Sequence, residues 1–76
     1  MVRLYSKLLG LMQEYGDVQD DVARTLLLSR ASVSNRMRGA AEWKLGEMYA
    51  LMDRYHVPYD RLHEVFPMGG RNEYMR

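Results

Sequence analysis

Apolar residues recur at steps of three and four along most of the chain, and this spacing places side chains on one face of an α-helix. Val22 and Leu26 lie four residues apart, and Val33 and Met37 repeat the same step after a short interval that contains Leu28. The pattern predicts two short helices that share one apolar seam and are joined by a tight turn.

Small and capping residues occupy the positions that this arrangement requires. Ala23 lies where two steeply crossing helices approach each other, and its small side chain leaves room for the second helix. Ser29 precedes the second helix and can accept a hydrogen bond from an unpaired backbone N–H as its N-cap. Gly39 follows the last apolar position and can adopt the left-handed conformation that ends a helix. The segment is therefore predicted to form a helix-turn-helix of the kind that reads DNA.

Apolar spacing also predicts supporting helices on both sides of this motif. The helix before it ends near Gly16, and its apolar face is formed by Leu4, Leu8, Leu11, Met12 and Tyr15. The segment after the motif is predicted to be a loop that Trp43 anchors in the core. A fourth helix follows, and its inward positions are Leu45, Met48, Met52 and Tyr55.

Proline and glycine residues divide the rest of the chain. Pro58 cannot continue a helix and restricts Val57 before it. A short fifth helix is predicted to begin near Pro58, with apolar positions at Tyr59, Leu62, Val65 and Phe66. Residues 67–76 contain adjacent glycines and no apolar period, which predicts a flexible tail after a domain of residues 1–66. No strand pattern occurs, so the predicted fold class is all-α.

The length of 76 residues allows one small core, whose stability is expected to be marginal or to depend on a partner subunit. The chain has no cysteine, which excludes disulfides and thiolate metal ligands and fits a reducing cytosol. No apolar run approaches the about 20 residues of a membrane span, and residues 1–10 show no signal-peptide cleavage pattern. We therefore expect a cytoplasmic protein with no membrane partner.

Positive charge is concentrated in the middle of the chain, although the formal net charge is only +1. The net charge is −2 over residues 1–21, +4 over residues 22–44 and −1 over residues 45–76. The positive segment contains the second predicted helix of the motif. This distribution favours double-stranded DNA as a partner at that helix.

Taken together, these positions resemble the Cro/C1-type helix-turn-helix family, also called the XRE family. The matching residues are Gln19, Val22, Ala23, Leu26, Leu28, Ser29, Val33 and Gly39. Residues 42–66 also resemble the fourth and fifth helices of small phage-type members, so the resemblance covers roughly residues 3–66. It implies a five-helix, lambda-repressor-like bundle in which helices 2 and 3 form the helix-turn-helix.

Two residues depart from the family pattern. Leu27 occupies the turn position where members usually have Gly, so either a leucine adopts positive φ or the turn is built differently. Arg36 lies where many members have a buried aliphatic residue or Trp. Met37 is then expected to close the seam, and Arg36 to reach the DNA backbone or an acidic residue on the next helix.

The resemblance implies that the second helix of the motif lies in the major groove of DNA with its outward side chains at the bases. The candidate base-reading residues are Arg30, Ala31, Ser34 and Asn35, and the candidate phosphate contacts are Gln19, Ser29, Ser32, Arg36 and Arg38. Arg30 can pair with guanine and Asn35 with adenine, and Ala31 can touch a thymine methyl group. Asp20 and Asp21 near this surface are interpreted as charge that complements a helix N-terminus.

The leading hypothesis is a sequence-specific transcriptional regulator, a Cro-like phage or prophage repressor that occupies an operator in nucleoid DNA. One monomer reads few base pairs, so we expect a homodimer on half-sites roughly 34–36 Å apart. The candidate dimer interface consists of Tyr55, Val57, Pro58 and Tyr59, and Tyr74 with Met75 is a second candidate.

A second hypothesis remains open, in which the same scaffold binds a protein as an antirepressor, an antitoxin or a phage-encoded inhibitor. The acidic residues at the start of the motif and the low net charge favour this alternative. No catalytic combination or glycine-rich phosphate loop is present, and His56 and His63 have no cluster of further metal ligands near them. We therefore expect no enzyme activity, no metal site and no cofactor.

Overall fold

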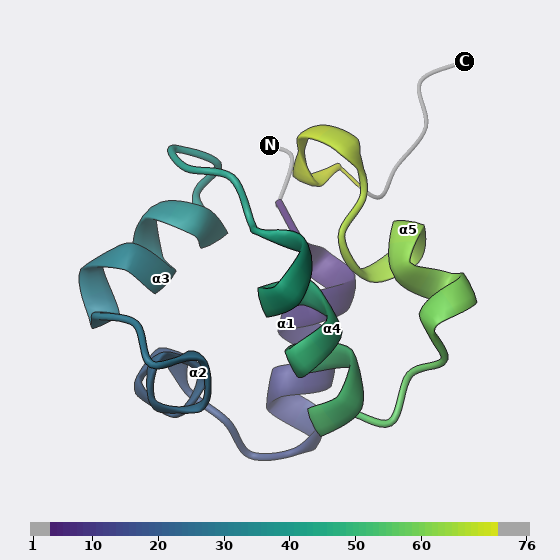
Figure 1. The fold of residues 1–76 in the computed structure, drawn as a ribbon, viewed down its shortest axis with the longest axis horizontal. Helices are drawn as coiled ribbons and strands as arrows, with labels where there is room; N and C mark the ends of the chain where they lie inside the picture. The colour runs from purple at the N-terminus through teal and green to yellow at the C-terminus, as the bar shows by residue number, and fades with distance from the viewer. Residues whose placement is uncertain (1–3, 72–76) are drawn as a thin grey trace.

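The computed structural model describes residues 4–71, and within them it contains five α-helices, two short 3-10 helices and no strand. The elements are α1 (Ser6–Glu14), α2 (Gln19–Leu26), α3 (Arg30–Met37), α4 (Leu45–Arg54), η1 (Tyr59–Arg61), α5 (Leu62–Val65) and η2 (Met68–Gly70). The prediction of an all-α fold is confirmed for this part of the chain. Figure 1 shows α3 along one edge of the molecule and α5 at the opposite edge, with α1 and α4 between them. No helix within the described residues is long and apolar enough to cross a bilayer.

The ends of α2 and α3 follow from the residues at their boundaries. The carboxylate of Asp21 accepts a hydrogen bond from the backbone N–H of Val18 at 2.8 Å, which satisfies a donor at the start of α2. Ser29 caps α3 as predicted, because its Oγ accepts the backbone N–H of Ser32 at 3.1 Å. Gly39 follows α3 with a φ of 81°, the left-handed conformation expected of it.

Leu27 shows how the turn between α2 and α3 is built without glycine. It ends α2 in the left-handed region, with φ 57° and ψ 42°, so a leucine adopts the conformation that glycine usually supplies. Its side chain is 91% exposed. The turn therefore keeps its shape at the cost of backbone strain and an uncovered apolar side chain.

The core is one contiguous set of apolar side chains that draws on every α-helix. In the predicted seam, Val22, Val33 and Met37 are buried and Leu26 and Leu28 are half-buried against the core, and Ala23 at the helix crossing is buried too. Trp43 is also buried, as expected of the residue that anchors the loop after α3. The remaining buried apolar residues are Tyr5, Leu8, Met12, Leu51, Met52, Tyr55, Val65 and Phe66.

Several residues predicted on inward helix faces are exposed instead. Tyr15 follows the last residue of α1, and its hydroxyl donates a hydrogen bond to the carbonyl of Tyr55 at 3.1 Å. Leu45 is the first residue of α4 and precedes the buried part of that helix. Tyr59 lies outside the core and donates its hydroxyl proton to Asp53 at 2.7 Å. A helical period locates the packed face, but it does not show where packing stops at the end of a helix.

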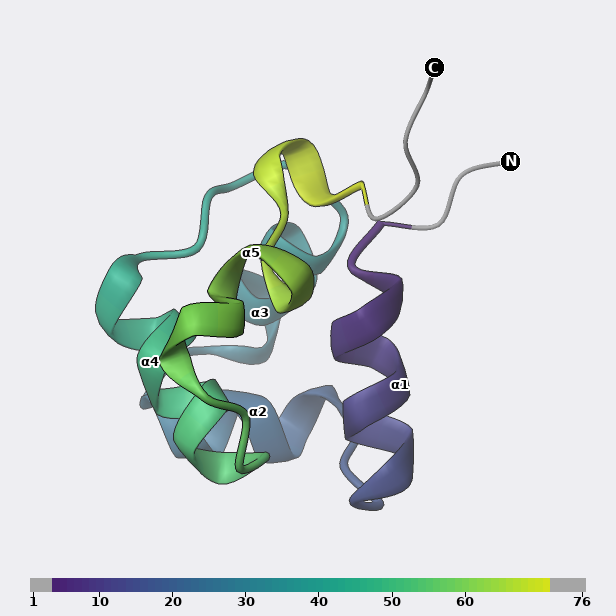
Figure 2. The ribbon, with the colours of Figure 1, turned by 90° about the vertical axis from the view of Figure 1, so that its right-hand side faces the viewer.

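Packed structure continues past residue 66, the predicted end of the domain. The sequence suggested a flexible tail from residue 67, but η2 lies against the start of α1 (Figure 2), and the Tyr5 N–H donates to the Gly70 carbonyl at 2.6 Å. A Cβ atom on Gly70 would lie 2.8 Å from the ring of Tyr5, so this close approach requires glycine. The structure places Gly70 against Tyr5, whereas the flexible tail over residues 67–76 stays a prediction, and residues 72–76 lie outside the described part of the chain.

Candidate nucleic-acid interface

The outer side of α3 is polar and lies at the edge of the molecule (Figure 1). The candidate base-reading residues Arg30, Ala31, Ser34 and Asn35 recur at a spacing that places them on one helix face. Arg30 and Ala31 are exposed, and Ser34 and Asn35 are half-buried. The structure thus brings these four residues together on one accessible strip, beside the buried side of the same helix that Val33 and Met37 form.

The N-terminal end of α3 carries a cluster of hydrogen-bonding groups. The hydroxyls of Ser29 and Ser32 lie 3.0 Å apart, with Ser29 donating to Ser32. Ser29 is exposed and Ser32 half-buried, and Gln19 begins α2 as a half-buried residue. Hydroxyls beside the unpaired backbone N–H groups of a helix N-terminus are the usual donors to a phosphate oxygen.

Arg36 does not belong to this accessible surface. Its guanidinium donates to both carboxylate oxygens of Glu47, through Nε at 2.8 Å and Nη2 at 3.2 Å, and the two side chains are only 11% and 13% exposed. Nη1 also donates to the carbonyl of Ser32 at 3.2 Å. Glu47 accepts the backbone N–H of Lys44 at 3.0 Å, so one carboxylate caps α4 and binds α3. The expected alternative of an acidic partner on the next helix is confirmed, and the predicted phosphate contact is corrected because the guanidinium is already engaged.

Two exposed ion pairs lie beside the candidate reading surface. Asp20 on α2 approaches Arg30 with 3.4 Å between Oδ1 and Nε, and the side chains are 52% and 73% exposed. Asp21 pairs with Arg24 at 2.8 Å while its other oxygen serves as the N-terminal cap of α2. The interpretation of Asp21 as a helix N-terminal charge is confirmed by this contact. The Asp20 carboxylate lies next to Arg30, a candidate base-reading residue, and the sequence pattern does not predict this contact.

Asn35 has local partners at the end of α3. Its side-chain oxygen accepts a hydrogen bond from Arg38 at 2.5 Å. Its backbone carbonyl accepts the N–H groups of Ala40 at 2.8 Å and Ala41 at 3.2 Å, which closes the last turn of the helix. The side chains of Asn35 and Arg38 are thus close enough to present their hydrogen-bonding groups as a pair.

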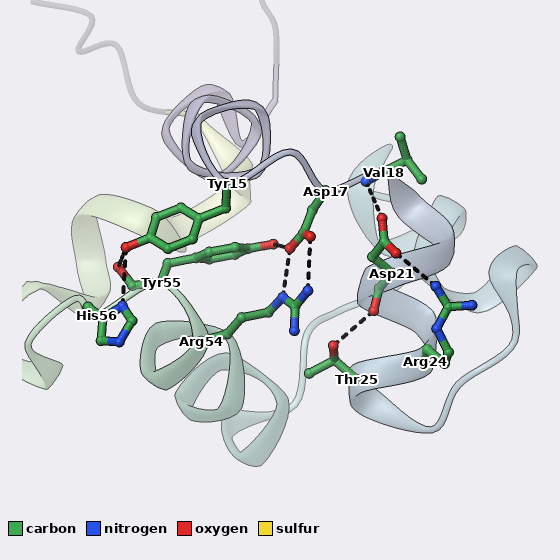
Figure 3. A network of polar contacts seen from close by, with 9 residues as sticks. All are labelled: Tyr15, Asp17, Val18, Asp21, Arg24, Thr25, Arg54, Tyr55 and His56. Carbon is green, nitrogen blue, oxygen red and sulfur yellow. Dashed lines mark hydrogen bonds and ion pairs between the residues drawn. The ribbon is translucent and has the colours of Figure 1, made fainter.

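A separate polar cluster secures the loop between α1 and α2 to the end of α4 (Figure 3). Arg54 donates to both oxygens of Asp17, at 2.6 and 2.9 Å, and the Tyr55 hydroxyl donates to the same carboxylate at 2.7 Å. The hydroxyl of Tyr15 bonds the Tyr55 carbonyl and lies 3.2 Å from Nδ1 of His56. The Asp17 side chain is only 7% exposed, whereas Arg54 is 37% exposed and Tyr15 and His56 are also accessible, so this cluster is a joint with a buried carboxylate and an exposed rim.

The electrostatics of this cluster follow from its hydrogen bonds. The pKa of Asp17 lies below its ordinary value, chiefly because Arg54 donates hydrogen bonds to the carboxylate. The pKa of Tyr55 is raised, first by burial and then by its hydrogen bond to Asp17. The pKa of Arg54 is raised by the same carboxylate. Each shift favours the protonation states that hold the three groups together.

Sequence reasoning did not identify this joint. Asp17 and Arg54 are 37 residues apart, and neither belongs to an apolar period or to a capping pattern. The only available signal was the position of Asp17 just after a predicted helix end. The partner of such a residue depends on tertiary packing, which the sequence spacing does not report.

The proposed dimer residues have different environments. Tyr55 is only 2% exposed, so its placement in a dimer interface is corrected: in this fold the ring belongs to the core. Val57 is half-buried, and Pro58 and Tyr59 are exposed. Tyr74 and Met75 lie outside the described residues.

The described residues contain no group of three or more acidic or histidine side chains placed to hold a metal ion. The candidate interface consists of hydrogen-bonding side chains on α3 and beside its N-terminal end. Neither a family model, nor a curated protein, nor a solved structure matches the chain.

Proposed function

We propose that the protein is a sequence-specific double-stranded DNA-binding regulator that uses α2 and α3 as a helix-turn-helix. The observation that supports this most directly is the outer side of α3, where four polar or small side chains share one accessible face at the edge of the molecule. A helix with such a face, preceded by a short turn and a bracing helix, suits insertion in the major groove. Occupation of an operator would then repress transcription in the manner of a small phage repressor.

The roles of the readers follow from their chemistry. Arg30 is proposed to donate two hydrogen bonds to guanine, and Asn35 to pair with adenine, with Ala31 against a thymine methyl group. Each two-bond contact of this kind gives about 1–3 kcal/mol of discrimination against the wrong base. Asn35 would exchange its contact with Arg38 for the base, and Arg38 would then be free to reach a phosphate.

Phosphate contacts are proposed at Gln19, Ser29, Ser32 and Arg38. These residues fix the position of the protein on the duplex, while the readers select the sequence. Arg36 has the role of holding α3 against α4 through Glu47, which keeps the reading face at a fixed angle.

A homodimer is proposed because two half-sites are needed for useful affinity and specificity. The exposed rings of Tyr49 and Tyr59 lie 4.6 Å apart, beside exposed Pro58, and provide apolar contact area away from α3. Tyr59→Glu should weaken self-association by about tenfold or more, since a buried interface aromatic often contributes about 2 kcal/mol. Sedimentation equilibrium measures this effect. A monomer both free and bound to DNA would contradict the dimer.

Selection of random DNA duplexes by the purified protein tests the proposed function. The wild type should enrich a two-fold symmetric site, and Asn35→Ala should fail to enrich it. Gln13→Ala is the matched control, because it removes the same amide from an exposed position on α1. Loss of enrichment in both variants, or no enrichment by the wild type, would contradict the assignment of α3 as the reader.

Binding to a protein is the second candidate function. The exposed carboxylate of Asp20 beside Arg30 favours it, because this charge would lie near the phosphates in a DNA complex. A salt series separates the two functions. Binding to DNA through several phosphates makes the logarithm of the association constant fall with the logarithm of salt concentration by about 0.9 per contact. A protein interface with few ion pairs lacks this steep dependence.

A further inference from the structure

A pocket lies between the loop after α3 and the segment of η2. Figure 1 shows these two segments at the top of the molecule. Its volume is about 340 Å³, near the lower limit of small-molecule sites. Its walls include the rings of Tyr5, Trp43 and Phe66, and Glu42 stands among the lining residues. The pocket is distinct from the outer side of α3, because none of the candidate base-reading residues lines it.

The aromatic wall is rigid and closely assembled. Trp43 lies edge-on to Phe66 with 5.3 Å between ring centroids, and edge-on to Tyr5 at 6.2 Å. All three residues belong to the core and are each only 7% exposed, so a small part of each borders the pocket. The indole N–H of Trp43 is buried and has no hydrogen-bond acceptor within the described residues.

Glu42 gives the pocket a negative charge. The residue is exposed, and no ion pair is formed by its carboxylate within residues 4–71, although Lys44 is two residues away. The pKa of the Tyr5 phenol is raised, first by burial and then by the charge of Glu42, so this carboxylate contributes negative potential at the phenol. A carboxylate beside three aromatic rings attracts a cation, because the ring faces also carry negative electrostatic potential.

We propose that this pocket binds a small organic cation, an ammonium group carried on an apolar stem. The stem packs against Trp43 and Phe66, and the ammonium lies between the rings and Glu42. An anionic ligand is disfavoured by the Glu42 carboxylate, and a purely apolar ligand gains no attraction from that charge. The proposal does not depend on DNA binding, since the pocket and the outer side of α3 are separate surfaces.

A ligand bound in this pocket contacts two segments of the chain that are far apart in the sequence. Gly39 and Ala41, in the loop after α3, line one side of the pocket, and Pro67 to Gly69 line the other. A bound cation therefore holds the segment after α3 against η2. Amide signals of residues 39–43 and 66–69 should shift together when it binds.

Trp43 is the single tryptophan of the chain, so its fluorescence reports on this pocket alone. The probe is phenethylammonium, and 2-phenylethanol is the neutral molecule of similar shape. A saturable change should occur with the cation, and the neutral alcohol should bind about tenfold more weakly. Equal affinity for the two probes, or no saturable change with either, would overturn the proposal.

Two variants locate the charge that the cation recognises. Glu42→Gln should weaken phenethylammonium binding by about fivefold, as expected for one partly solvated charge contact. Glu14→Gln removes the same charge from an exposed position on α1 outside the pocket, and should leave the affinity unchanged. Circular dichroism verifies that both variants are folded. An equal effect of both variants, or amide shifts confined to segments other than 39–43 and 66–69, would assign the binding to nonspecific attraction and refute the site.

Discussion

The two sides of α3 use the same kind of ion pair in different surroundings. Arg36 and Glu47 are nearly buried and share two hydrogen bonds, whereas Arg30 and Asp20 are largely exposed and approach at a single 3.4 Å contact. Removing one member of a buried pair leaves an uncompensated charge, while an exposed pair contributes little to stability. The comparison shows that burial, and not residue type, separates an arginine that fixes the helix from one that is free to contact a partner.

The largest expected effect on stability comes from a change at the buried ion pair between Arg36 and Glu47. Glu47→Gln keeps the shape of the side chain but leaves the Arg36 charge without a counter-charge, and should lower the free energy of unfolding by about 2.5 kcal/mol. Urea denaturation followed by circular dichroism measures this change. The exposed Glu14→Gln is the control and should have almost no effect. Equal stability of the two variants would show that the buried pair is not a structural joint.

The joint between Asp17, Arg54 and Tyr55 should show its own pH dependence. Asp17→Asn removes the charged acceptor of Arg54 and Tyr55, and should cost about 1.5 kcal/mol at neutral pH. Since the pKa of Asp17 is lowered on folding, its stabilisation is present above the unfolded pKa of about 3.9 and is lost as the pH falls through the folded value. Urea unfolding of wild type and variant at neutral and acidic pH should therefore give curves that converge in acid. A difference that grows below pH 4 would contradict this account.

The turn between α2 and α3 offers a change that stabilises the protein. Leu27→Gly removes the strain of a leucine at φ 57° and loses no buried area, because the side chain is exposed. After the entropy cost of glycine is subtracted, the gain should be about 0.5 kcal/mol. A thermal melt tests it, with Thr25→Gly, inside α2, as the contrasting substitution that should destabilise. A loss of stability in Leu27→Gly would mean that the leucine makes stabilising contacts.

The smallest effect on stability is expected at the exposed ion pair between Asp20 and Arg30. Asp20→Asn breaks the pair with Arg30 and should change the free energy of unfolding by about 0.3 kcal/mol or less. Under the proposed function, the same change should raise affinity for DNA by about threefold at low salt, because it removes a negative charge near the phosphates. Fluorescence anisotropy with a labelled duplex measures the affinity. Weaker binding would instead assign Asp20 a role in holding Arg30 for its contact.

Local features of the fold were predictable, and distant polar pairings were not. The seam of Val22, Val33 and Met37 and the cap at Ser29 follow from spacing and from residue chemistry within a few positions. The joint between Asp17 and Arg54 spans 37 residues and leaves no periodic trace.

Two features that apolar spacing does not predict have the same physical origin. Tyr55 was predicted both on a core face and at a dimer interface, and only its burial decides between these roles. The segment of residues 67–70 lacks an apolar period, yet its backbone is held by the hydrogen bond from Tyr5 to Gly70. Both outcomes depend on which distant segment packs against the residue, and apolar spacing contains no such information.

The most direct test of the central claim is to map DNA contacts by NMR. Amide and side-chain signals of the protein are followed while a short duplex is added at low ionic strength. Changes should concentrate at Gln19, along the outer side of α3 and at Arg38, while the signals of Asp17 and Arg54 stay nearly constant. Changes confined to Tyr49, Tyr59 and their neighbours, or no change at all, would contradict the assignment of α3 as a DNA-reading helix.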